Sequence, residues 1–352
     1  MIGPEDIDAV SDVLRSGHLA QGARVEEFEA AVAGFLTRRG GVATSSGTGA
    51  LHLALLTLDI GPGDEVLLPS YTCVALLHAV RYVGATPRLV DIAAGEYGMC
   101  PHEARRRMTP RTRAIIVPHM FGMPADLDAL GGLGLPLIED CAQTLGATYR
   151  GRTVGSAGTI TVCSFYATKV ITTGEGGMLL ADSEVVLRRA RDLRDYDGRG
   201  ALPTRFNYKM TDFQAALGLS QLKRLGEFIA RRRALAARYA ASFREYSLIL
   251  PADAPERTHI FYRYVIGVDD APRLAGALRD RGVECKTPVP RPLHRYLGEE
   301  GFSHTEAVTA RALSIPLYPS LTDQDAERLL LEVTDALARR EDRRRLVSSL
   351  SS

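Results

Sequence analysis

The chain has 352 residues, more than the roughly 250–300 at which a single hydrophobic core usually stops growing. A hydrophobic fraction of 45% and a charged fraction of 24% are ordinary for a globular protein and exclude an intrinsically disordered chain. Lys and Arg number 43 against 42 Asp and Glu, so the formal net charge of +1 creates no global field for nucleic acid or a membrane. Any anion-binding site is therefore expected to be local.

Cysteine usage and the N-terminal segment indicate a reducing compartment. The five cysteines are scattered, without the close Cys-x-x-Cys pairs of a zinc site, so we expect no metal centre. The first residues include acids where a secretory signal peptide has a basic region and an apolar run, and no stretch approaches ~18 consecutive apolar residues. We expect a cytoplasmic protein that spans no membrane.

Short apolar runs alternate with helical patterns between about residues 45 and 182. Six of the runs predict buried strands, over 65–68, 88–90, 114–117, 135–138, 160–163 and 178–180. The intervening patterns predict helices over about 48–58, 72–83, 102–108 and 124–132. This order is typical of a largely parallel sheet covered by helices on both faces. The last two runs are too close for a parallel crossover, so one of those strands is expected to run against the rest or to lie elsewhere in the sheet.

A long helix is predicted after Thr211. Gln214 stands three residues later, in the spacing of a capping box, and apolar residues then recur at helical intervals. The arginines at 231–233 are interpreted as a solvated face of this helix. Two prolines follow, and strand-like alternation then resumes. We expect a large domain over 1–245 and a small C-terminal domain over 246–352.

Small residues and hydroxyls gather where the helix over 48–58 begins. In the run 45–52, free backbone N–H groups, the positive end of the helix dipole and the Thr48 hydroxyl would form a cradle for a phosphate. The same run is also a common helix cap. It matches neither a P-loop nor a GxGxxG fingerprint, which argues against ATP and dinucleotides.

Glu139 and Asp140 end the strand over 135–138, at the edge where open α/β sheets bind ligands. One of these carboxylates could cap a helix or form a salt bridge, and a ligand cation such as a protonated ring nitrogen would serve equally well as a partner. Gln143, three positions on, could supply a neutral donor one helical turn away.

Lys169 follows the next strand and precedes a glycine-rich loop. A lone lysine on a loop is usually a surface charge. Here the neighbouring loops would crowd it, and a desolvated lysine amine is a nucleophile able to form a Schiff base. A phosphate cradle, a strand-end acid and a buried lysine are the three features that pyridoxal 5'-phosphate requires of a protein.

Six segments together resemble the DegT/DnrJ/StrS family of sugar aminotransferases. They span residues 47–75, 138–158, 164–180, 205–222, 291–294 and 313–321, in the order and spacing of that family. The resemblance runs from about residue 3 to 337. It implies an α/β protein with the fold type I of pyridoxal-phosphate-dependent transferases, as in aspartate aminotransferase. Such a fold has a large domain with a mostly parallel mixed sheet between helices, and a smaller C-terminal α+β domain.

The resemblance also implies roles for individual residues. Lys169 would bind the cofactor covalently and act as general base and acid, and Asp140 would pair with the pyridine nitrogen. Gln143 would lie near the ring hydroxyl.

The phosphate of the cofactor would be held, by the same resemblance, by Thr48, the Gly49 backbone and Ser164. Asn207 would reach the cofactor phosphate of the neighbouring subunit. A homodimer with active sites shared across the interface is therefore implied.

One position departs from the family pattern. Cys73 stands where family members often stack an aromatic ring on the cofactor, and Tyr71 could substitute for that ring. Tyr71, His294 and Tyr318 are candidates for the substrate pocket. Arg199 belongs to a cationic stretch before the long helix that could bind the phosphates of a nucleotide.

The function implied is transfer of an amino group from glutamate to a nucleotide-linked keto sugar, in amino-sugar biosynthesis. The closest alternative is transfer from glutamine or glutamate to a keto-cyclitol, which the motifs barely separate from the first. A related branch of sugar dehydratases has histidine in place of the lysine, so Lys169 argues against it. A cofactor-binding regulator acting on DNA lacks a sequence basis, because no segment is left for a helix-turn-helix domain. The sugar, the nucleotide and the ring carbon that receives nitrogen are not encoded in motifs.

Overall fold

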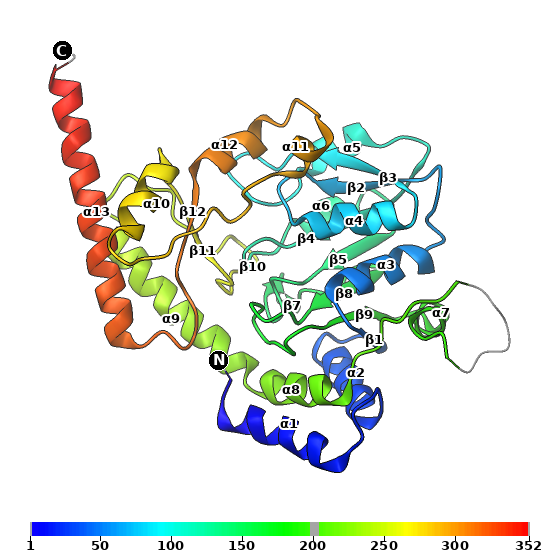
Figure 1. The fold of residues 1–352 in the computed structure, drawn as a ribbon. Helices are drawn as coiled ribbons and strands as arrows, with labels where there is room; N and C mark the ends of the chain where they lie inside the picture. Colours follow the sequence, from blue (N-terminus) through cyan, green and yellow to red (C-terminus); the bar gives the residue numbers. More distant parts are fainter. Residues whose placement is uncertain (1, 198–203, 351–352) are drawn as a thin grey trace.

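The computed structural model describes residues 2–197 and 204–350, with the backbone alone for 341–350. Its main sheet has seven strands in the order β1, β9, β8, β5, β4, β2, β3 (Figure 1). Their bounds are Gly40–Thr44 (β1), Gly177–Ala181 (β9), Ile160–Ser164 (β8), Leu137–Asp140 (β5), Thr112–Pro118 (β4), Glu65–Pro69 (β2) and Thr86–Val90 (β3). Strand β9 runs antiparallel to both of its neighbours, and the other pairs are parallel. The predicted mostly parallel mixed sheet, with one of its last two strands reversed, is confirmed.

Strand β1 is the strand of the main sheet that the sequence did not predict. It begins with Gly40 and Gly41, which weaken the apolar signal of the segment. Gly41 is needed for packing, because a Cβ there would lie 2.8 Å from the sulfur of Met178 and 3.3 Å from the carbonyl of Glu29. The absence of a side chain thus lets helix α2 and strand β9 approach β1 closely.

Helices cover both faces of this sheet, and most lie close to their predicted places. The helices up to residue 223 are α1 (Pro4–Ser16), α2 (Ala23–Phe35), α3 (Gly47–Thr57), α4 (Val74–Tyr82), α5 (Pro101–Arg107), α6 (Leu127–Gly131), α7 (Glu184–Arg194) and α8 (Asp212–Lys223). One core joins α3, α4 and α7 to one face of the sheet, and a second core joins α2, α5 and α6 to the other. Consecutive strand residues alternate between the cores, as Ile116 and Val117 do.

The predicted long helix is two helices. Thr211 N–H donates to Gln214 Oε1 at 3.0 Å, so the expected capping interaction begins α8. Arg224 interrupts the helical run with φ −100° and ψ 2°, and α9 then spans Leu225–Phe243. The expected solvated face is wrong for Arg232, which is buried and donates to the carbonyl groups of Phe261, Tyr262 and Leu317.

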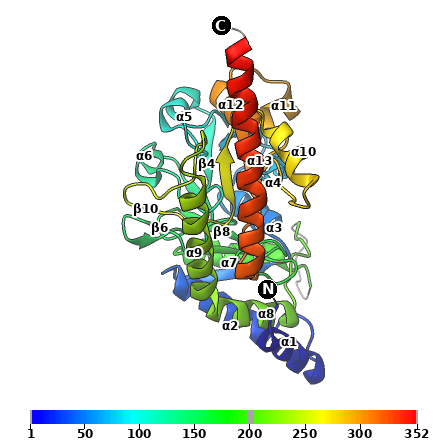
Figure 2. The same ribbon diagram turned by 90° about the vertical axis from the view of Figure 1, so that its left-hand side faces the viewer.

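A third core lies towards the C-terminus. It joins Leu235, Tyr239 and Phe243 of α9 to a two-stranded sheet and two further helices. The elements of this region are β11 (Tyr264–Gly267), α10 (Ala271–Arg279), α11 (Leu293–Leu297), α12 (Ser303–Arg311), β12 (Ala312–Ile315) and α13 (Asp323–Leu350). Figure 2 shows α9 and α13 running side by side, and these helices are in contact. The division at 245/246 stays a prediction.

Three short strands form a separate sheet beside the main one, in the order β10, β6, β7. They span Thr148–Tyr149 (β6), Arg152–Thr153 (β7) and Arg257–Thr258 (β10). Across the described residues, no helix is both long enough and apolar enough to cross a bilayer.

Glu139 holds the loop after β7 against the end of β5. Its fully buried carboxylate accepts the backbone N–H groups of Gly155 and Ala157, each at 2.8 Å, and that of Gly158. Arg38 binds the carbonyl groups of the same loop, donating to Gly155 O at 2.7 Å and to Gly158 O at 2.6 Å. The loop is thus fixed by an anion on its N–H groups and a cation on its carbonyl groups.

Replacing Glu139 by Gln should lower the free energy of unfolding by roughly 2 kcal/mol at neutral pH, because an amide NH₂ would face backbone N–H donors. Burial alone would raise the pKa of Glu139, but its bonds to His119 and to the loop outweigh burial and lower the pKa. The carboxylate therefore stabilises the fold above its unfolded pKa, and this contribution is lost as the pH falls through the folded pKa. Urea unfolding of both proteins at decreasing pH should show the difference shrinking in acid.

The matched control is Glu327→Gln, which removes an exposed carboxylate that lies 3.4 Å from Arg238. Exposed pairs contribute little, so this variant should unfold within about 0.5 kcal/mol of wild type. If Glu139→Gln behaves like this control, the role of Glu139 in stability is wrong.

Candidate active site

Helix α3 begins beside the carboxyl ends of β8 and β1. Ser46 caps the helix, its Oγ accepting the Gly49 N–H at 3.1 Å. Among the described residues, none accepts a hydrogen bond from the N–H groups of Gly47 or Thr48, as expected at a helix N-terminus. A Cβ on Gly47 would lie 2.8 Å from the Cβ of Ser164, so the end of β8 packs directly against this turn. The predicted cradle residues Thr48, Gly49 and Ser164 are therefore brought together.

Asp140 ends β5 on the same side of the sheet. The residues two positions before Asp140 and Ser164, which are Ile138 and Val162, both pack in the core that contains α3, and alternation places Asp140 and Ser164 on that face. Asp140 is 7% exposed, and its Oδ1 accepts the Ala142 N–H at 3.0 Å. Its Oδ2 receives no hydrogen bond from any described residue. Burial raises the pKa of Asp140, and the nearby charge of Lys169 only partly opposes this.

Lys169 is partly buried in a turn after β8, where its N–H donates to Tyr166 O at 2.8 Å. Its Nζ lies 5.6 Å from the centroid of the Tyr262 ring. Lys169 also lines a cavity of about 830 Å³, the rest of whose lining comes from residues 167 and 168, α9 and the C-terminal region. The amine therefore opens to a cavity, and its charge is near enough to Asp140 to oppose the rise in the pKa of that carboxyl.

The other predicted cofactor residues lie at the neighbouring strand ends. Gln143 Oε1 accepts the Phe121 N–H at 2.9 Å, which leaves the amide NH₂ as a donor. Cys73 is exposed at the start of α4. Tyr71 is fully buried, with its ring stacked on that of Tyr97 at 6.0 Å, so it is not presented as a free aromatic face.

Asn207 lies in an extended segment that is anchored on α3. The Ser45 N–H donates to Tyr208 O at 2.7 Å, and the rings of Phe206 and Tyr208 stack at 5.2 Å, each of them also packing against His52 of α3. The side chain of Asn207 lies between these two anchors in sequence and is exposed. Within one chain, its neighbours hold the segment at the anion cradle while Asn207 itself faces outward.

The predicted substrate residues are scattered. His294 is buried, with Nδ1 2.6 Å from Ser70 Oγ and Nε2 2.6 Å from Glu306 Oε1, so both ring nitrogens already have partners in the chain. Tyr318 is 46% exposed and lines the same cavity as Lys169. Arg199 lies outside the described residues.

The cationic stretch around residue 199 is largely paired with carboxylates. Three of its members form ion pairs, namely Arg194 with Glu29 at 2.5 Å, Arg205 with Asp192 at 3.1 Å and Lys209 with Asp195 at 2.9 Å. These three positive charges are therefore neutralised within the chain, as in most charged loops, where such pairs are solvated or structural and do not bind a ligand phosphate.

His119, Glu139 and Cys141 bring together a nitrogen, an oxygen and a sulfur donor. His119 Nδ1 accepts the Ala125 N–H at 3.0 Å, which leaves the proton on Nε2, facing Glu139 Oε2 at 3.3 Å. Burial raises the pKa of the Cys141 thiol, which disfavours the thiolate that metals bind. We therefore assign this cluster to the hydrogen-bond network under the sheet.

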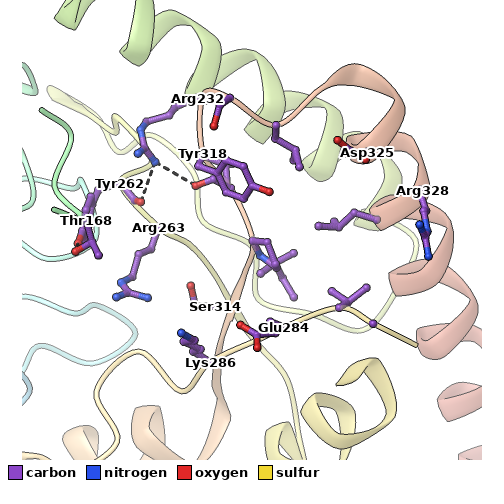
Figure 3. Close-up of a pocket in the computed structure, with 18 of the residues that line it drawn as sticks. Thr168, Arg232, Tyr262, Arg263, Glu284, Lys286, Ser314, Tyr318, Asp325 and Arg328 are labelled. Carbon is purple, nitrogen blue, oxygen red and sulfur yellow. Dashed lines mark hydrogen bonds between the residues drawn. The ribbon is translucent and has the colours of Figure 1, made fainter. Parts of the chain in front are cut away.

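Sequence reasoning missed three residues of the cavity, Tyr262, Arg263 and Lys286 (Figure 3). Tyr262 is 7% exposed and lies next to Lys169, and Arg263 precedes strand β11. All three come about 100 residues after Lys169. Tyr262 and Arg263 belong to a segment whose pattern indicates only a strand, and Lys286 lies beyond that segment. No local pattern in the sequence indicates that these three residues line the same cavity as Lys169 in the folded chain.

The residues present fit pyridoxal phosphate. The N-terminal turn of α3 offers free N–H groups and the Thr48 hydroxyl to a phosphate. At the other end of the site, Asp140 keeps an oxygen without a partner among the described residues. Burial raises the pKa of Asp140, and a ring cation beside the free oxygen would favour the ionised carboxylate.

Comparisons with known proteins agree on one family. Residues 1–334 match the model of the DegT/DnrJ/EryC1/StrS aminotransferase family. The chain is 34% identical to GDP-perosamine synthase of Caulobacter vibrioides, over 89% of this chain and 90% of that one. The crystal structure of DesV from S. venezuelae is 34% identical with a TM-score of 0.89, covering 94% of each chain.

A further structural relative has been solved with cofactor. The sugar aminotransferase Spr1654 from Streptococcus pneumoniae in its PLP form has a TM-score of 0.90 and 25% identity, over 96% of this chain and 97% of that one. The same protein is also known in a PMP form, with a TM-score of 0.91. The predicted fold type is confirmed by these similarities.

Replacing Asp140 by Asn should have opposite effects on cofactor binding and on the cofactor-free fold. Loss of the charged partner should weaken pyridoxal phosphate binding by roughly 10- to 100-fold. Because burial raises the pKa of Asp140, its ionised form destabilises the cofactor-free fold above that pKa, so the variant should be at least as stable as wild type at pH 7. Absorbance titration with the cofactor and urea unfolding without it measure the two effects.

Asp64→Asn is the matched control, because Asp64 Oδ2 also accepts a backbone N–H, that of Gly61 at 3.0 Å, but at the opposite edge of the sheet, before β2. This variant should bind the cofactor normally. Unchanged cofactor affinity in Asp140→Asn would contradict the assignment of Asp140.

Proposed function

This chain belongs to the DegT/DnrJ/EryC1/StrS aminotransferase family, and on that premise we propose that it transfers an amino group from glutamate to a nucleotide-linked keto sugar. It is a pyridoxal-phosphate-dependent aminotransferase, like the relatives solved with that cofactor. The observation that carries the proposal is an accessible amine, Lys169, near a buried carboxylate, Asp140, one oxygen of which has no partner among the described residues. The relation to GDP-perosamine synthase supports a nucleotide-linked acceptor.

Pyridoxal phosphate, when bound, supplies an aldehyde for amines and a ring that accepts electrons from the carbon next to the amine. Lys169 would supply the amine that holds the cofactor until the amino group of the donor replaces it. The Lys169 Nζ would then be free to take a proton from the donor carbon and to return it at a second position. Lys169 lies beside Tyr262 and lines the cavity, so a ligand in the cavity could contact its amine.

Asp140 would keep a proton on the ring nitrogen of the bound cofactor. As an anion in a buried site, it favours a cationic partner and so makes the bound ring a stronger electron acceptor. Thr48, Gly49 and Ser164 would hold the phosphate, and Gln143 would donate from its free amide NH₂. The phosphate and the ring nitrogen are thereby held by opposite ends of the site.

The active form is proposed to be a homodimer. Asn207 is exposed, and the segment that carries it is fixed to α3 by Phe206 and Tyr208. A second copy of the chain, placed against this surface, would receive Asn207 at its own cofactor phosphate. Each site would then contain residues from both chains.

The acceptor is tested by incubating the loaded enzyme and L-glutamate with nucleotide-linked 4-keto and 3-keto sugars, and separately with a free keto-inositol. Amino-sugar formation, measured by mass spectrometry, is expected only with nucleotide-linked acceptors. Turnover of the keto-inositol alone would favour the cyclitol alternative.

Replacing Lys169 by Ala should abolish the visible absorbance that arises when the cofactor is joined to a lysine, and should lower turnover by at least about 10³-fold, because both the covalent anchor and the proton carrier are lost. The control is Lys223→Ala, since Lys223 is exposed on α8. That variant should keep both the absorbance and the activity. Transamination by a folded Lys169→Ala protein would refute the role of Lys169.

Mixing Lys169→Ala chains with Asn207→Ala chains should restore activity. In a mixed dimer, one of the two sites contains both wild-type residues, so up to about half of the sites in such dimers should work. Differently tagged chains, refolded together and purified on both tags, provide the sample for the assay. Verified mixed dimers without activity, from two inactive parents, would show that the site is not shared.

A further inference from the structure

A second cation shares one corner of the cavity with Lys169. The Arg263 Cζ lies 5.7 Å from the centroid of the Tyr262 ring, and the Lys169 Nζ lies 5.6 Å from the same centroid. Figure 3 shows Arg263 beside Tyr262 and Thr168, on the side of the cavity nearer the main sheet. The Tyr262 ring is thus the common neighbour of two positive charges.

Arg263 has no anionic partner among the described residues, although it is partly buried. Arg281, in contrast, lines the same cavity and pairs with Glu332 at 3.2 Å and Asp335 at 2.5 Å. A cation that is taken partly out of water without a counterion lowers the stability of the fold. The corner with Arg263 and Lys169 therefore favours an anion supplied by a ligand.

The acidic residues of the cavity lie elsewhere. Figure 3 places Asp325 and Arg328 on α13, across the cavity from Arg263, and Glu284 beside Lys286. Asp325 already accepts the Thr322 hydroxyl at 2.6 Å. Among the described residues, no carboxylate therefore neutralises Arg263, which lines the same cavity as Lys169.

We propose that Arg263 binds the carboxylate of the amino-acid donor. This inference rests on the proposed function, in which the donor amino group takes the place of the Lys169 amine. An α-amino acid carries its carboxylate one carbon away from its amine, so the group that recognises it has to lie close to Lys169. The planar guanidinium of a single arginine matches one carboxylate with two parallel hydrogen bonds.

A nucleoside diphosphate fits this corner less well. Of the two cations there, Lys169 is committed to the amino group in the proposed function, which leaves Arg263 alone for an anion, whereas two phosphates carry two or more negative charges. The N–H groups that suit a phosphate lie at α3. Arg263 therefore distinguishes amino acids from simple amines as donors, and leaves recognition of the acceptor to other residues.

The test uses the loaded enzyme without any acceptor, so that only the donor half of the reaction occurs. Arg263→Gln should raise the L-glutamate concentration needed for half-maximal conversion of the cofactor absorbance by roughly 10- to 100-fold. Arg263→Lys keeps the charge without the fork and should recover part of this loss. Propylamine, an amine without a carboxylate, should react equally with all of these proteins.

Arg328→Gln is the matched control, because Arg328 is exposed in the same cavity and has no ion-pair partner among the described residues. It removes the same charge from the opposite wall and should leave the glutamate dependence unchanged. As a readout independent of reaction, calorimetric titration with glutarate should show weaker binding to Arg263→Gln than to Arg328→Gln.

Wild-type glutamate dependence in a correctly loaded Arg263→Gln protein would overturn the inference and leave the proposed function intact. The same holds if Arg263→Gln weakens binding of UDP or GDP while glutamate and glutarate bind normally, since Arg263 would then serve the acceptor. A wild-type protein that reacts with propylamine but with no amino acid would overturn the proposed function and, with it, the inference. If Arg263→Gln fails to load the cofactor, Arg263→Lys carries the same comparison.

Discussion

The candidate site depends on two adjacent carboxylates at the end of β5, those of Glu139 and Asp140. Consecutive residues of a strand point to opposite faces of a sheet, so Glu139 and Asp140 enter different surroundings although one peptide bond joins them. Glu139 is saturated by backbone N–H groups and fixes the loop after β7. Asp140 faces the side of α3 and keeps one oxygen without a partner among the described residues. Glu139 thus fixes a loop against the end of β5, where Asp140, the proposed partner of the cofactor ring, also lies.

The different surroundings of Glu139 and Asp140 also explain why the pKa values of the two carboxyls shift in opposite directions. The pKa of Glu139 is lowered because its hydrogen bonds outweigh burial, whereas burial raises the pKa of Asp140, which has fewer compensating partners. Buried ionisable groups with few hydrogen-bond or ion-pair partners are typical of ligand-binding sites. Arg263 is the cationic counterpart, since it is partly buried and lacks a carboxylate partner among the described residues.

Much of this arrangement could be predicted from the sequence, because the carboxyl ends of neighbouring parallel strands meet at one edge. That rule predicts Asp140 at the ligand-binding edge, and Lys169 follows the next strand, whereas the role of Ser164 came from the family resemblance. Strand β1 was not predicted because its glycines weaken the hydrophobic pattern of the segment. The break at Arg224 was not predicted because the apolar periodicity continues across it. Arg232 looked solvated within an arginine run, yet it is buried because three carbonyl groups from distant segments converge on it. Contacts of that kind depend on tertiary packing and leave no local trace.

Helix α9 belongs to two cores at once. Its first turns, with Leu225 and Phe228, pack with the main sheet, whereas Leu235, Tyr239 and Phe243 belong to the C-terminal core. Because one helix packs in both cores, unfolding of either core removes packing partners from the same helix. Melting of one half of the molecule would therefore expose the apolar face of the helix that the other half needs, so the protein should denature as one cooperative body instead of in two independent steps.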